Sequence, residues 1–435
     1  MESVYVAAAM LAFVFLALGV GVWVFAGLLA VAFGGMIFLG DFSVARTVII
    51  AKSVIWKSAT TWELAAIPLF LWMGEIIFRS DISDRLFRGL APLVEWLPGR
   101  LLHTNVMGCT LFAAVSGSTS ATTATVGKIT LSALKERGYS QSLSLGSLAG
   151  AGSLGLLIPP SIILIIYGVL AEVSIAKLFA AGVMPGLLVA GLFSTYIIIR
   201  CLINPKLSPP SNSKKTLKVW VSAFIDLIPI GSLIFVVLGG IYSGIVTPSE
   251  AAAVGVLAAM ILTACTGNLN TPLLIDSLMA AVRTSCMVCS ILISAALLST
   301  AIGYLHVPTG LTKLIGQMDL SVYSLLLLLA LMYIMLGLFL DGISILVMTV
   351  PIVLPIILQA NVDPIWFGIF LVLMIEMGQV TPPVGFNLFV IQGITDQHLK
   401  DVVTAAFPFF LLMVLAVVLL VIYPAIVTYL PDLIT

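Results

Sequence analysis

The amino-acid sequence predicts an all-α polytopic membrane protein with an inverted repeat, two re-entrant hairpins and two broken helices. Composition gives the class: 61% of the 435 residues are hydrophobic, only 9% are charged, and the mean hydropathy is +1.22. A soluble globular domain carries about 25% charged residues, so this chain is expected to lie in a bilayer. Its formal net charge is zero, which gives no basis for binding nucleic acid.

Pro-Pro pairs inside two long apolar runs predict the broken helices. The first pair lies in GSLGLLIPPS, from Gly152 to Ser161, and the second in EMGQVTPPVGFNLF, from Glu376 to Phe389. Proline removes a backbone donor and blocks the helical turn before it, so carbonyl groups are left unpaired. Such a break is tolerated in a bilayer only where it is buried in protein or lines a cavity. Two breaks in matching places point to the binding site of a secondary transporter.

The first half of the chain divides into scaffold helices with an arm, 1–61, and a first repeat, 62–199. At about 20 residues per span, we expect spans at 4–20, 22–39, 62–78 and 178–199, an arm at 41–61 and an interfacial connector at 79–100. The segment 101–134 carries SGSTSATT at 116–123, which is too polar for one lipid-facing helix. It is predicted to be a hairpin that enters and leaves on one side, followed by a broken helix at 143–170.

The second half repeats this plan after a linker. Three prolines and a Ser/Asn/Lys run mark the stretch 200–218 as a cytoplasmic linker. Scaffold helices and an arm are expected at 219–285, and a second repeat at 286–435. Within them we predict spans at 226–242, 250–265, 286–303 and 405–430, an arm at 268–283, a hairpin at 321–358 with its tip around 337–345, and a broken helix at 366–392.

A constant shift of 223 residues relates the two halves. It carries Pro159, Pro160, Gly155 and Pro185 onto Pro382, Pro383, Gly378 and Pro408. It also carries Ser118, at the first hairpin tip, onto Asp341 in the second. We interpret these coincidences as an internal duplication.

Counting crossings gives the topology of the repeat. Four full crossings separate the two broken helices, because a hairpin returns to its own side, so the repeat is inverted. Most of the 19 lysine and arginine residues fall in connectors on one side, which the positive-inside rule assigns to the cytoplasm. The first apolar run has no basic segment and no cleavage pattern of a signal peptide. Both termini are therefore expected on the outer side.

The breaks predict a site for cations and an organic anion near the membrane midplane. Helix C-termini offer unpaired carbonyls suited to Na⁺, and the N-termini beyond the breaks suit a carboxylate or sulfonate. The alternative is that the prolines only kink the helices and that the Gly, Ser and Thr residues only permit close packing.

Three polar residues inside apolar segments are further candidates. Asp341 would cost roughly 2.5–3.5 kcal/mol in the middle of a span, so it is predicted to be functional, with capping of the hairpin tip as the alternative. Glu376 would either hold the broken backbone or touch the substrate. Asn387 would satisfy a freed carbonyl or reach the substrate. None of the three histidines has a metal-ligand partner at a useful spacing.

Long motifs in both halves resemble one transporter family. The first half contains SGSTSATTATVGKITLSALKERGYS, LAGAGSLGLLIPPSIILIIYGVLAEVSI and AAGVMPGLL, and the second contains GLFLDG and EMGQVTPPVGFNLFV. These are similar to the large permease subunit of tripartite ATP-independent periplasmic (TRAP) transporters, of the ion transporter superfamily. The resemblance covers essentially the whole chain. It implies an elevator-type fold, in which arms and outer helices form a scaffold while the hairpins and broken helices move as a transport domain.

The resemblance also implies a function and partners. It predicts uptake of a small organic acid, driven by two or more Na⁺ ions and supplied by a periplasmic substrate-binding protein. A small four-helix membrane subunit is the other expected partner, as a separate chain because this one begins with the large-subunit pattern. The expected location is the bacterial or archaeal cytoplasmic (inner) membrane, with several passes and both termini periplasmic.

The family's sites can be carried over residue by residue. One Na⁺ site would lie at Ser116, Ser118, Gly155, Ile158 and Pro159, and another at Gly337, Gly378 and Thr381. Ile158 is the repeat partner of Thr381, so the first site lacks that hydroxyl. Our own predictions for substrate contacts are Thr119, Asp341 and Asn387. Beside an anionic substrate, Asp341 would serve a Na⁺ ion or a substrate hydroxyl or amine.

Three other classes remain open. A stand-alone Na⁺/organic-anion symporter of the same superfamily would need no binding protein. An intramembrane protease would need a second aspartate facing Asp341, and only Glu376 and Glu75 lie well inside other spans. A channel fits less well, because hairpins that close from opposite sides suit alternating access. The sequence does not name the substrate: C4-dicarboxylates, sialic acid, other sugar acids and small sulfonates all fit such a site.

Overall fold

Helices make up the regular structure throughout the part of the chain that the computed structural model describes, residues 2–210, 216–317, 320–382, 385–395 and 397–434. This confirms the predicted all-α class. The first half contains α1 (Glu2–Gly19), α2 (Val24–Gly34), α3 (Val44–Ala59), α4 (Ala66–Arg79), α5 (Ile82–Val94), α6 (Leu102–Ser116), α7 (Thr119–Glu136), α8 (Gln141–Ser153), α9 (Ile162–Ala171) and α10 (Ile175–Ile203). The second half contains α11 (Leu217–Tyr242), α12 (Pro248–Cys265), α13 (Thr271–Tyr304), α14 (Val307–Gln317), α15 (Val322–Gly337), α16 (Gly342–Gln359), α17 (Pro364–Gln379), α18 (Phe386–Ile394), α19 (Leu399–Ile422) and α20 (Ala425–Leu433).

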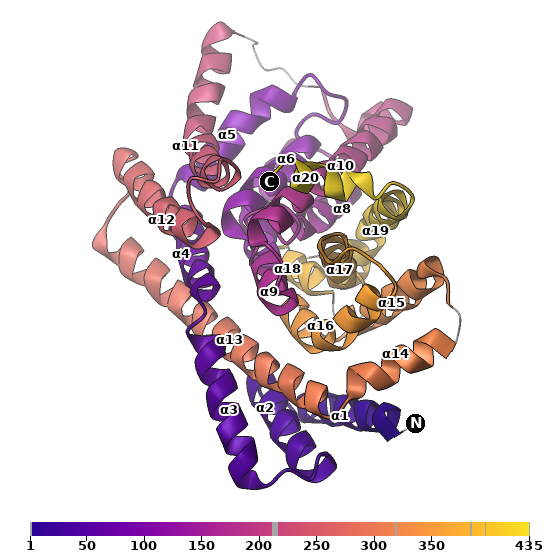
Figure 1. Cartoon of the computed structure of the whole chain (residues 1–435). Helices are drawn as coiled ribbons and strands as arrows, with labels where there is room; N and C mark the ends of the chain where they lie inside the picture. Colours follow the sequence, from indigo (N-terminus) through magenta and orange to yellow (C-terminus); the bar gives the residue numbers. More distant parts are fainter. Residues whose placement is uncertain (1, 211–215, 318–319, 383–384, 396, 435) are drawn as a thin grey trace.

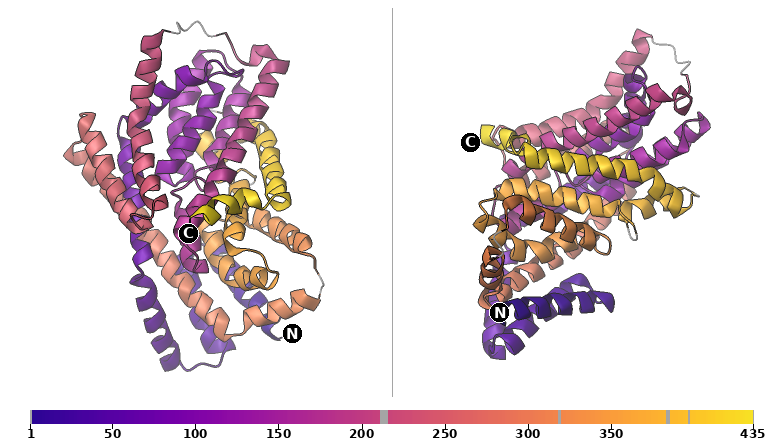
Figure 2. Two further views of the ribbon diagram at one scale, coloured as in Figure 1. Left: turned by 45° about the horizontal axis from the view of Figure 1, so that its top comes forward. Right: turned by 90° about the vertical axis from the view of Figure 1, so that its right-hand side faces the viewer.

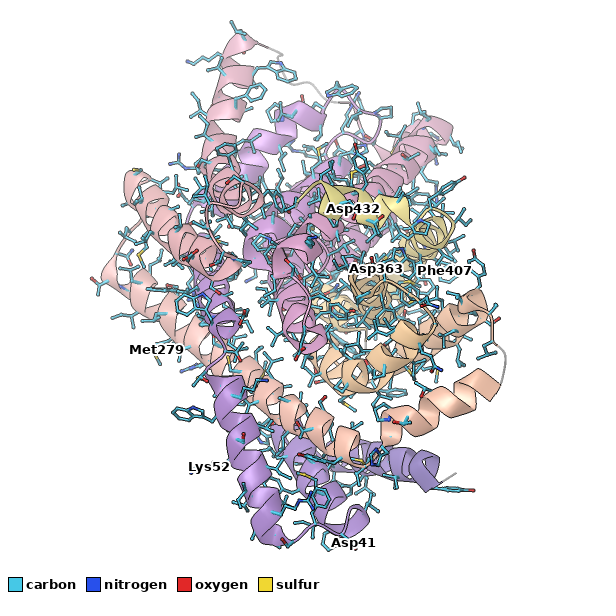
Figure 3. The ribbon with its side chains drawn as sticks, in the orientation of Figure 1. Asp41, Lys52, Met279, Asp363, Phe407 and Asp432 are labelled. Carbon is cyan, nitrogen blue, oxygen red and sulfur yellow. The ribbon has the colours of Figure 1, made fainter. Side chains whose placement is uncertain are left out.

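Several helices are suited to cross a bilayer. Within the described residues, six are long and apolar enough to do so, namely α10, α11, α12, α13, α16 and α19, and the bent pair α3–α4 gives a seventh if it counts as one span. Large apolar side chains also cover the outside of these helices. Figure 3 labels two of them, Met279 on α13 and Phe407 on α19, which are 48% and 58% exposed. An apolar outer surface of this kind is what hydrocarbon requires, and it supports a multi-pass membrane protein.

The long helix α13 corrects one predicted division. The arm at 268–283 and the span at 286–303 form a single helix of 34 residues, about 50 Å long. The helix is continuous because no proline or glycine interrupts the chain between Pro272 and Gly303. In the first half, the corresponding segment bends by 54° between α3 and α4. There, the hydroxyl groups of Thr60 and Thr61 donate to carbonyls in the last turn of α3.

Two other boundaries differ from the prediction. The last predicted span, 405–430, is divided into α19 and α20, because Pro424 cannot continue the first helix. Helix α10 extends to Ile203 and α11 begins at Leu217, so both ends of the predicted linker 200–218 are helical. The middle of that linker, 211–215, lies outside the described residues.

The helix boundaries repeat with the shift of 223 residues found in the sequence. Shifting α7, Thr119–Glu136, by this amount gives the bounds of α16, Gly342–Gln359. The residues that cap α7 and α8, Ser118 and Ser140, likewise correspond to Asp341 and Asp363, which cap α16 and α17. The duplication therefore extends from the motifs to the helices themselves.

Packing between the halves is reciprocal. Helix α2 packs against α13, and its counterpart α12 packs against α4, the counterpart of part of α13. In the same way α9 packs against α16, while α18 packs against α7. Exchanges of this kind are what an approximate two-fold relation between the repeats produces. Figure 1 shows α13 running between α1–α3 and the central group formed by α8, α9 and α16–α18. The views in Figure 2 place α1 and α2 at one end of the molecule and α11 at the other.

Candidate functional site

Both predicted helix breaks are present. Break 1, residues 154–161, separates α8 from α9, and break 2, residues 380–385, separates α17 from α18. Asp363 starts α17 by accepting hydrogen bonds from the backbone N–H groups of Ile365 and Trp366, at 2.6 and 3.2 Å. Pro383, one of the duplicated prolines, lies outside the described residues. Each break is thus set between a capped helix and a shorter helix that continues beyond it.

The first hairpin tip lies against break 1. Gly117 joins α6 to α7 in a left-handed conformation, with φ of 57°, which glycine adopts without strain. A Cβ atom on Gly155 would lie 2.9 Å from the carbonyl carbon and oxygen of Ser118, so the two backbones touch. The hydroxyl of Ser116 lies 2.7 Å from that of Thr122. The structure therefore brings together Ser116, Ser118 and Gly155, three of the residues predicted for one Na⁺ site.

The other two residues of that predicted site lie within break 1. The side chain of Ile158 is directed to α10, since a Cβ atom on Gly186 would come 2.7 Å from its Cγ1 atom. Pro159 follows it in the break. Apolar side chains at both positions leave backbone carbonyls as the oxygen donors that they could offer.

The residues of the second predicted Na⁺ site meet where α15 ends. A Cβ atom on Gly337 would lie only 2.6 Å from the Cα atom of Gly378, so α15 and α17 touch backbone to backbone. The hydroxyl of Thr381 donates to the carbonyl of Met377 at 2.6 Å, and its N–H group donates to the carbonyl of Gly378 at 3.2 Å. The Thr381 oxygen can still accept a hydrogen bond or bind a cation.

The three predicted substrate residues have different surroundings. Thr119 donates to the Oε1 atom of Gln379 at 2.8 Å, across the interface between the repeats. Asp341 is exposed and caps α16, accepting from the N–H groups of Ile343 and Ser344 at 3.1 and 3.2 Å and from the Ser344 hydroxyl. The capping role considered for Asp341 is therefore present, and it leaves one face of the carboxylate open.

Asn387 lies on the first turn of α18 and is fully buried. Neither its Nδ2 nor its Oδ1 atom has a hydrogen-bond partner among the described residues. An unpartnered buried amide costs free energy, so a partner from outside the chain is expected.

Two polar residues of α17 lie at the site in addition to the predicted Na⁺ and substrate residues, and one of them, Glu376, was already a candidate without an assigned role. Gln379, the last residue of α17, accepts a hydrogen bond from Thr119 and was not predicted. A signal was present in the sequence, because a polar residue here replaces the apolar Leu156 of the first repeat. Glu376 is fully buried, and the backbone N–H groups of Leu156 and Leu157 in break 1 face its carboxylate without completing a hydrogen bond. The carboxylate therefore lies at the interface of the two repeats.

Oxygen donors at the breaks differ from those of a transition-metal centre. Among the described residues, no group of three or more His, Cys, Asp or Glu side chains is placed to hold a metal ion. Carbonyl and hydroxyl oxygens gather instead at the hairpin tips, and these are the ligands that Na⁺ uses at unwound helix ends.

A separate cavity of about 750 Å³ lies between the outer and central helices. It is lined by residues of the α3–α4 bend, the α9–α10 connection, the start of α12 and the middle of α13, including Lys57, Glu63, Glu172, Ser249 and Leu292. The contact between these two groups of helices is thus incomplete on this side of the molecule.

The inverted repeat, the paired breaks and the apolar outer surface together define a membrane transport protein. A family model described as "Tripartite ATP-independent periplasmic transporter, DctM component" matches residues 9–426. The chain therefore belongs to this family, and it is a transport permease rather than an enzyme.

Relatives and a solved structure agree with this membership. The chain is 32% identical to the C4-dicarboxylate TRAP transporter large permease protein DctM of Pseudomonas aeruginosa, over 87% of this chain and 88% of that protein. It is 33% identical to the isethionate TRAP transporter permease protein DctMQ of Oleidesulfovibrio alaskensis, over 86% of this chain and 59% of that protein. The crystal structure of the Alcanivorax borkumensis YdaH transporter matches its fold with a TM-score of 0.64 at 13% identity, covering 86% of this chain and 87% of that one.

Proposed function

We propose that this chain is the large membrane subunit of a Na⁺-driven importer of a small organic acid. The observation that carries the proposal is the contact between each hairpin and a broken helix: Ser118 with Gly155 in break 1, and Gly337 with Gly378 near the end of α17. Each contact gathers carbonyl and hydroxyl oxygens at a helix C-terminus, where a hard cation is stabilised. The two predicted Na⁺ sites, which also include Ser116, Ile158, Pro159 and Thr381, would occupy these contacts.

The substrate is proposed to be a carboxylate, sugar acid or sulfonate. Family members are named for C4-dicarboxylates and for isethionate, which are small carboxylates and a small sulfonate. The buried, unpartnered Asn387 on the first turn of α18 supports an anion there, because a helix N-terminus favours negative charge. Thr119 and Asp341, at the two hairpin tips, would complete the contacts.

An elevator movement would carry the site across the membrane. The hairpins and broken helices, α6–α9 and α15–α18, would move as one body against a scaffold that includes α1–α5 and α11–α14. The cavity of about 750 Å³ between outer and central helices supports a movable contact, since tight packing would resist sliding.

The proposed partners follow from the family. A periplasmic binding protein would deliver the acid, and a small four-helix membrane subunit would pack on the scaffold. The complex would lie in the inner membrane, with both termini of this chain in the periplasm. The rival is a stand-alone symporter, which would need neither partner.

Uptake into proteoliposomes tests the proposal. Vesicles containing this chain and the small subunit would receive labelled acids with the loaded binding protein, under an inward Na⁺ or K⁺ gradient. We expect accumulation only with Na⁺ and the binding protein. Equal uptake without the binding protein would favour the stand-alone symporter, and equal uptake with K⁺ would overturn Na⁺ coupling.

A further inference from the structure

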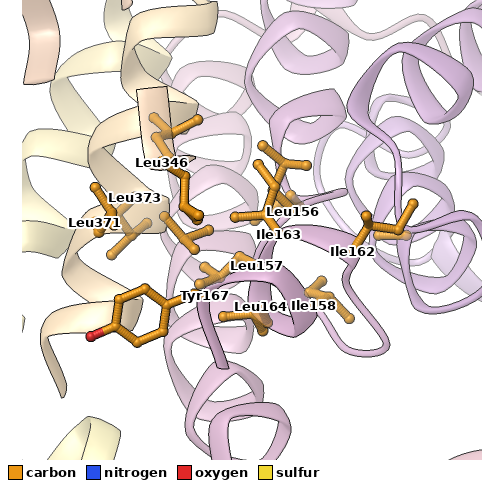
Figure 4. Close-up of a cluster of buried hydrophobic side chains, with 14 of the residues drawn as sticks. Leu156, Leu157, Ile158, Ile162, Ile163, Leu164, Tyr167, Leu346, Leu371 and Leu373 are labelled. Carbon is orange, nitrogen blue, oxygen red and sulfur yellow. The ribbon is translucent and has the colours of Figure 1, made fainter. Parts of the chain in front are cut away.

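The two breaks differ in polarity although their backbones repeat. Four polar residues of the second repeat, Glu376, Gln379, Thr381 and Asn387, have Ser153, Leu156, Ile158 and Leu164 as their counterparts after the shift of 223 residues. Figure 4 shows Leu156, Ile158 and Leu164 within a cluster of buried apolar side chains. Leu346 of α16 and two leucines of α17 belong to the same cluster. A single substrate that lacks two-fold symmetry would therefore find its polar partners at break 2.

Gln379 occupies a central position in this asymmetry. It is only 8% exposed, and its Oε1 atom accepts the hydrogen bond from Thr119 at the first hairpin tip. On its other side, a Cβ atom on Gly342 would lie 3.1 Å from the Nε2 atom of Gln379. Gly342 is the first residue of α16, directly after Asp341. One side chain of α17 thus contacts both hairpin tips.

The amide nitrogen of Gln379 has unused hydrogen-bonding capacity. Its Oε1 atom is engaged with Thr119, so Nε2 is left with two N–H donors. None of the described residues accepts a hydrogen bond from Nε2. Beyond break 2, the amide of Asn387 is fully buried and also lacks a partner. Two neutral amides with free donors are thus present on the two sides of the same break.

We propose that Gln379 determines substrate specificity by recognising a second acceptor group on the acid. This inference rests on the proposed function. The N-terminus of α18 and Asn387 would bind the first acidic group, while the Gln379 amide donates to a second carboxylate or to a hydroxyl. Amide donors suit this role because they bind an acceptor without adding a charge to a buried site. Leu156, the counterpart at break 1, offers no such donor.

Matched pairs of acids give a direct test. Succinate differs from butyrate by one carboxylate, and isethionate differs from ethanesulfonate by one hydroxyl. Uptake of each acid by the complete complex would be measured under an inward Na⁺ gradient. For each pair, kcat/KM of the acid with two acceptor groups would be divided by kcat/KM of the acid with one. For wild type we expect the two-acceptor member to be preferred.

Gln379→Met keeps the length of the side chain and removes its donors. Losing a hydrogen bond to a charged acceptor should lower the kcat/KM ratio of succinate to butyrate about ten- to one-hundred-fold, chiefly by raising the KM for succinate. Gln379→Glu keeps the size and an acceptor for Thr119, so it serves if the Met variant does not fold. It should disfavour succinate further by repulsion. Leu156→Met, at the counterpart position, is the control and should leave the ratio unchanged.

The outcomes separate this inference from the proposed function. An unchanged ratio in Gln379→Met, with wild-type uptake that depends on Na⁺ and the binding protein, would overturn the role of Gln379 alone. A wild type that imports both members of each pair equally would also overturn the role of Gln379 in specificity. A wild type that imports none of the four acids would reject the small dicarboxylate and sulfonate substrates on which this inference rests, and uptake that is independent of Na⁺ would reject the proposed function itself.

Discussion

The contact between Gly337 and Gly378 allows the proposed second Na⁺ site to be tested by one methyl group. In Gly337→Ala, the new Cβ atom would lie 2.6 Å from the Cα atom of Gly378. Non-bonded carbon atoms prefer about 3.5–4.0 Å, so α15 and α17 must separate by roughly 1 Å. The neighbouring atoms are backbone atoms and cannot rotate away.

The expected magnitude follows from that displacement. Overpacking a tight contact typically costs about 1–3 kcal/mol of stability. The same movement displaces the carbonyls of α15 and α17, whereas cation–ligand distances must hold to within about 0.2 Å. A loss of about 1.4 kcal/mol in binding corresponds to a tenfold weaker Na⁺ affinity, and we expect at least this.

The assay is the thermal stability of the purified complex in Na⁺ and in K⁺. A bound ion raises Tm as its concentration exceeds Kd, so Gly337→Ala should need about tenfold more Na⁺ for the same increase. Gly191→Ala on α10 is the control, because a Cβ atom there meets nothing within 4 Å. A Gly337→Ala protein with the same Tm and Na⁺ dependence as the control would refute the reasoning.

Substitutions at three further positions address the remaining contacts. Gly155→Ala places a Cβ atom 2.9 Å from the Ser118 carbonyl; it should weaken the Na⁺ dependence of uptake by about tenfold, and an unchanged dependence would exclude Na⁺ binding at that contact. Asp341→Asn should keep the helix cap, because Asn caps as well as Asp, whereas Asp341→Ala should lose about 0.5–2 kcal/mol of stability. If Asp341 also binds an ion or the substrate, the Asp341→Asn variant should lose uptake; normal uptake by this variant would reject a role in binding. Glu376→Gln should keep the packing, and Glu376→Ala should lose about 2–5 kcal/mol by creating a cavity; equal melting temperatures of the two variants would contradict a packed position at the repeat interface.

Much of the fold could be predicted because its causes are local. The Pro-Pro pairs interrupt helices wherever they occur, and a helix break in a bilayer needs a protected place. The shift of 223 residues, recognised from Gly155 and a few prolines, reappears in the bounds of α7 and α16. The continuity of α13 was missed: the segment was divided into an arm at 268–283 and a span at 286–303, although no proline or glycine lies between Pro272 and Gly303.

The contacts of the site were beyond sequence reasoning, because they join residues that are distant in the chain. Thr119 and Gln379 are 260 positions apart, yet they share a hydrogen bond. The family resemblance placed Gly337 and Gly378 at one Na⁺ site, but only the crossing of α15 and α17 shows that neither can hold a side chain. The sequence by itself determined the membrane class, the duplication and the two breaks, since composition and backbone chemistry are properties of each segment. Tertiary structure decided which breaks meet which hairpin tips and which polar side chains lack a partner, because packing between the repeats sets both.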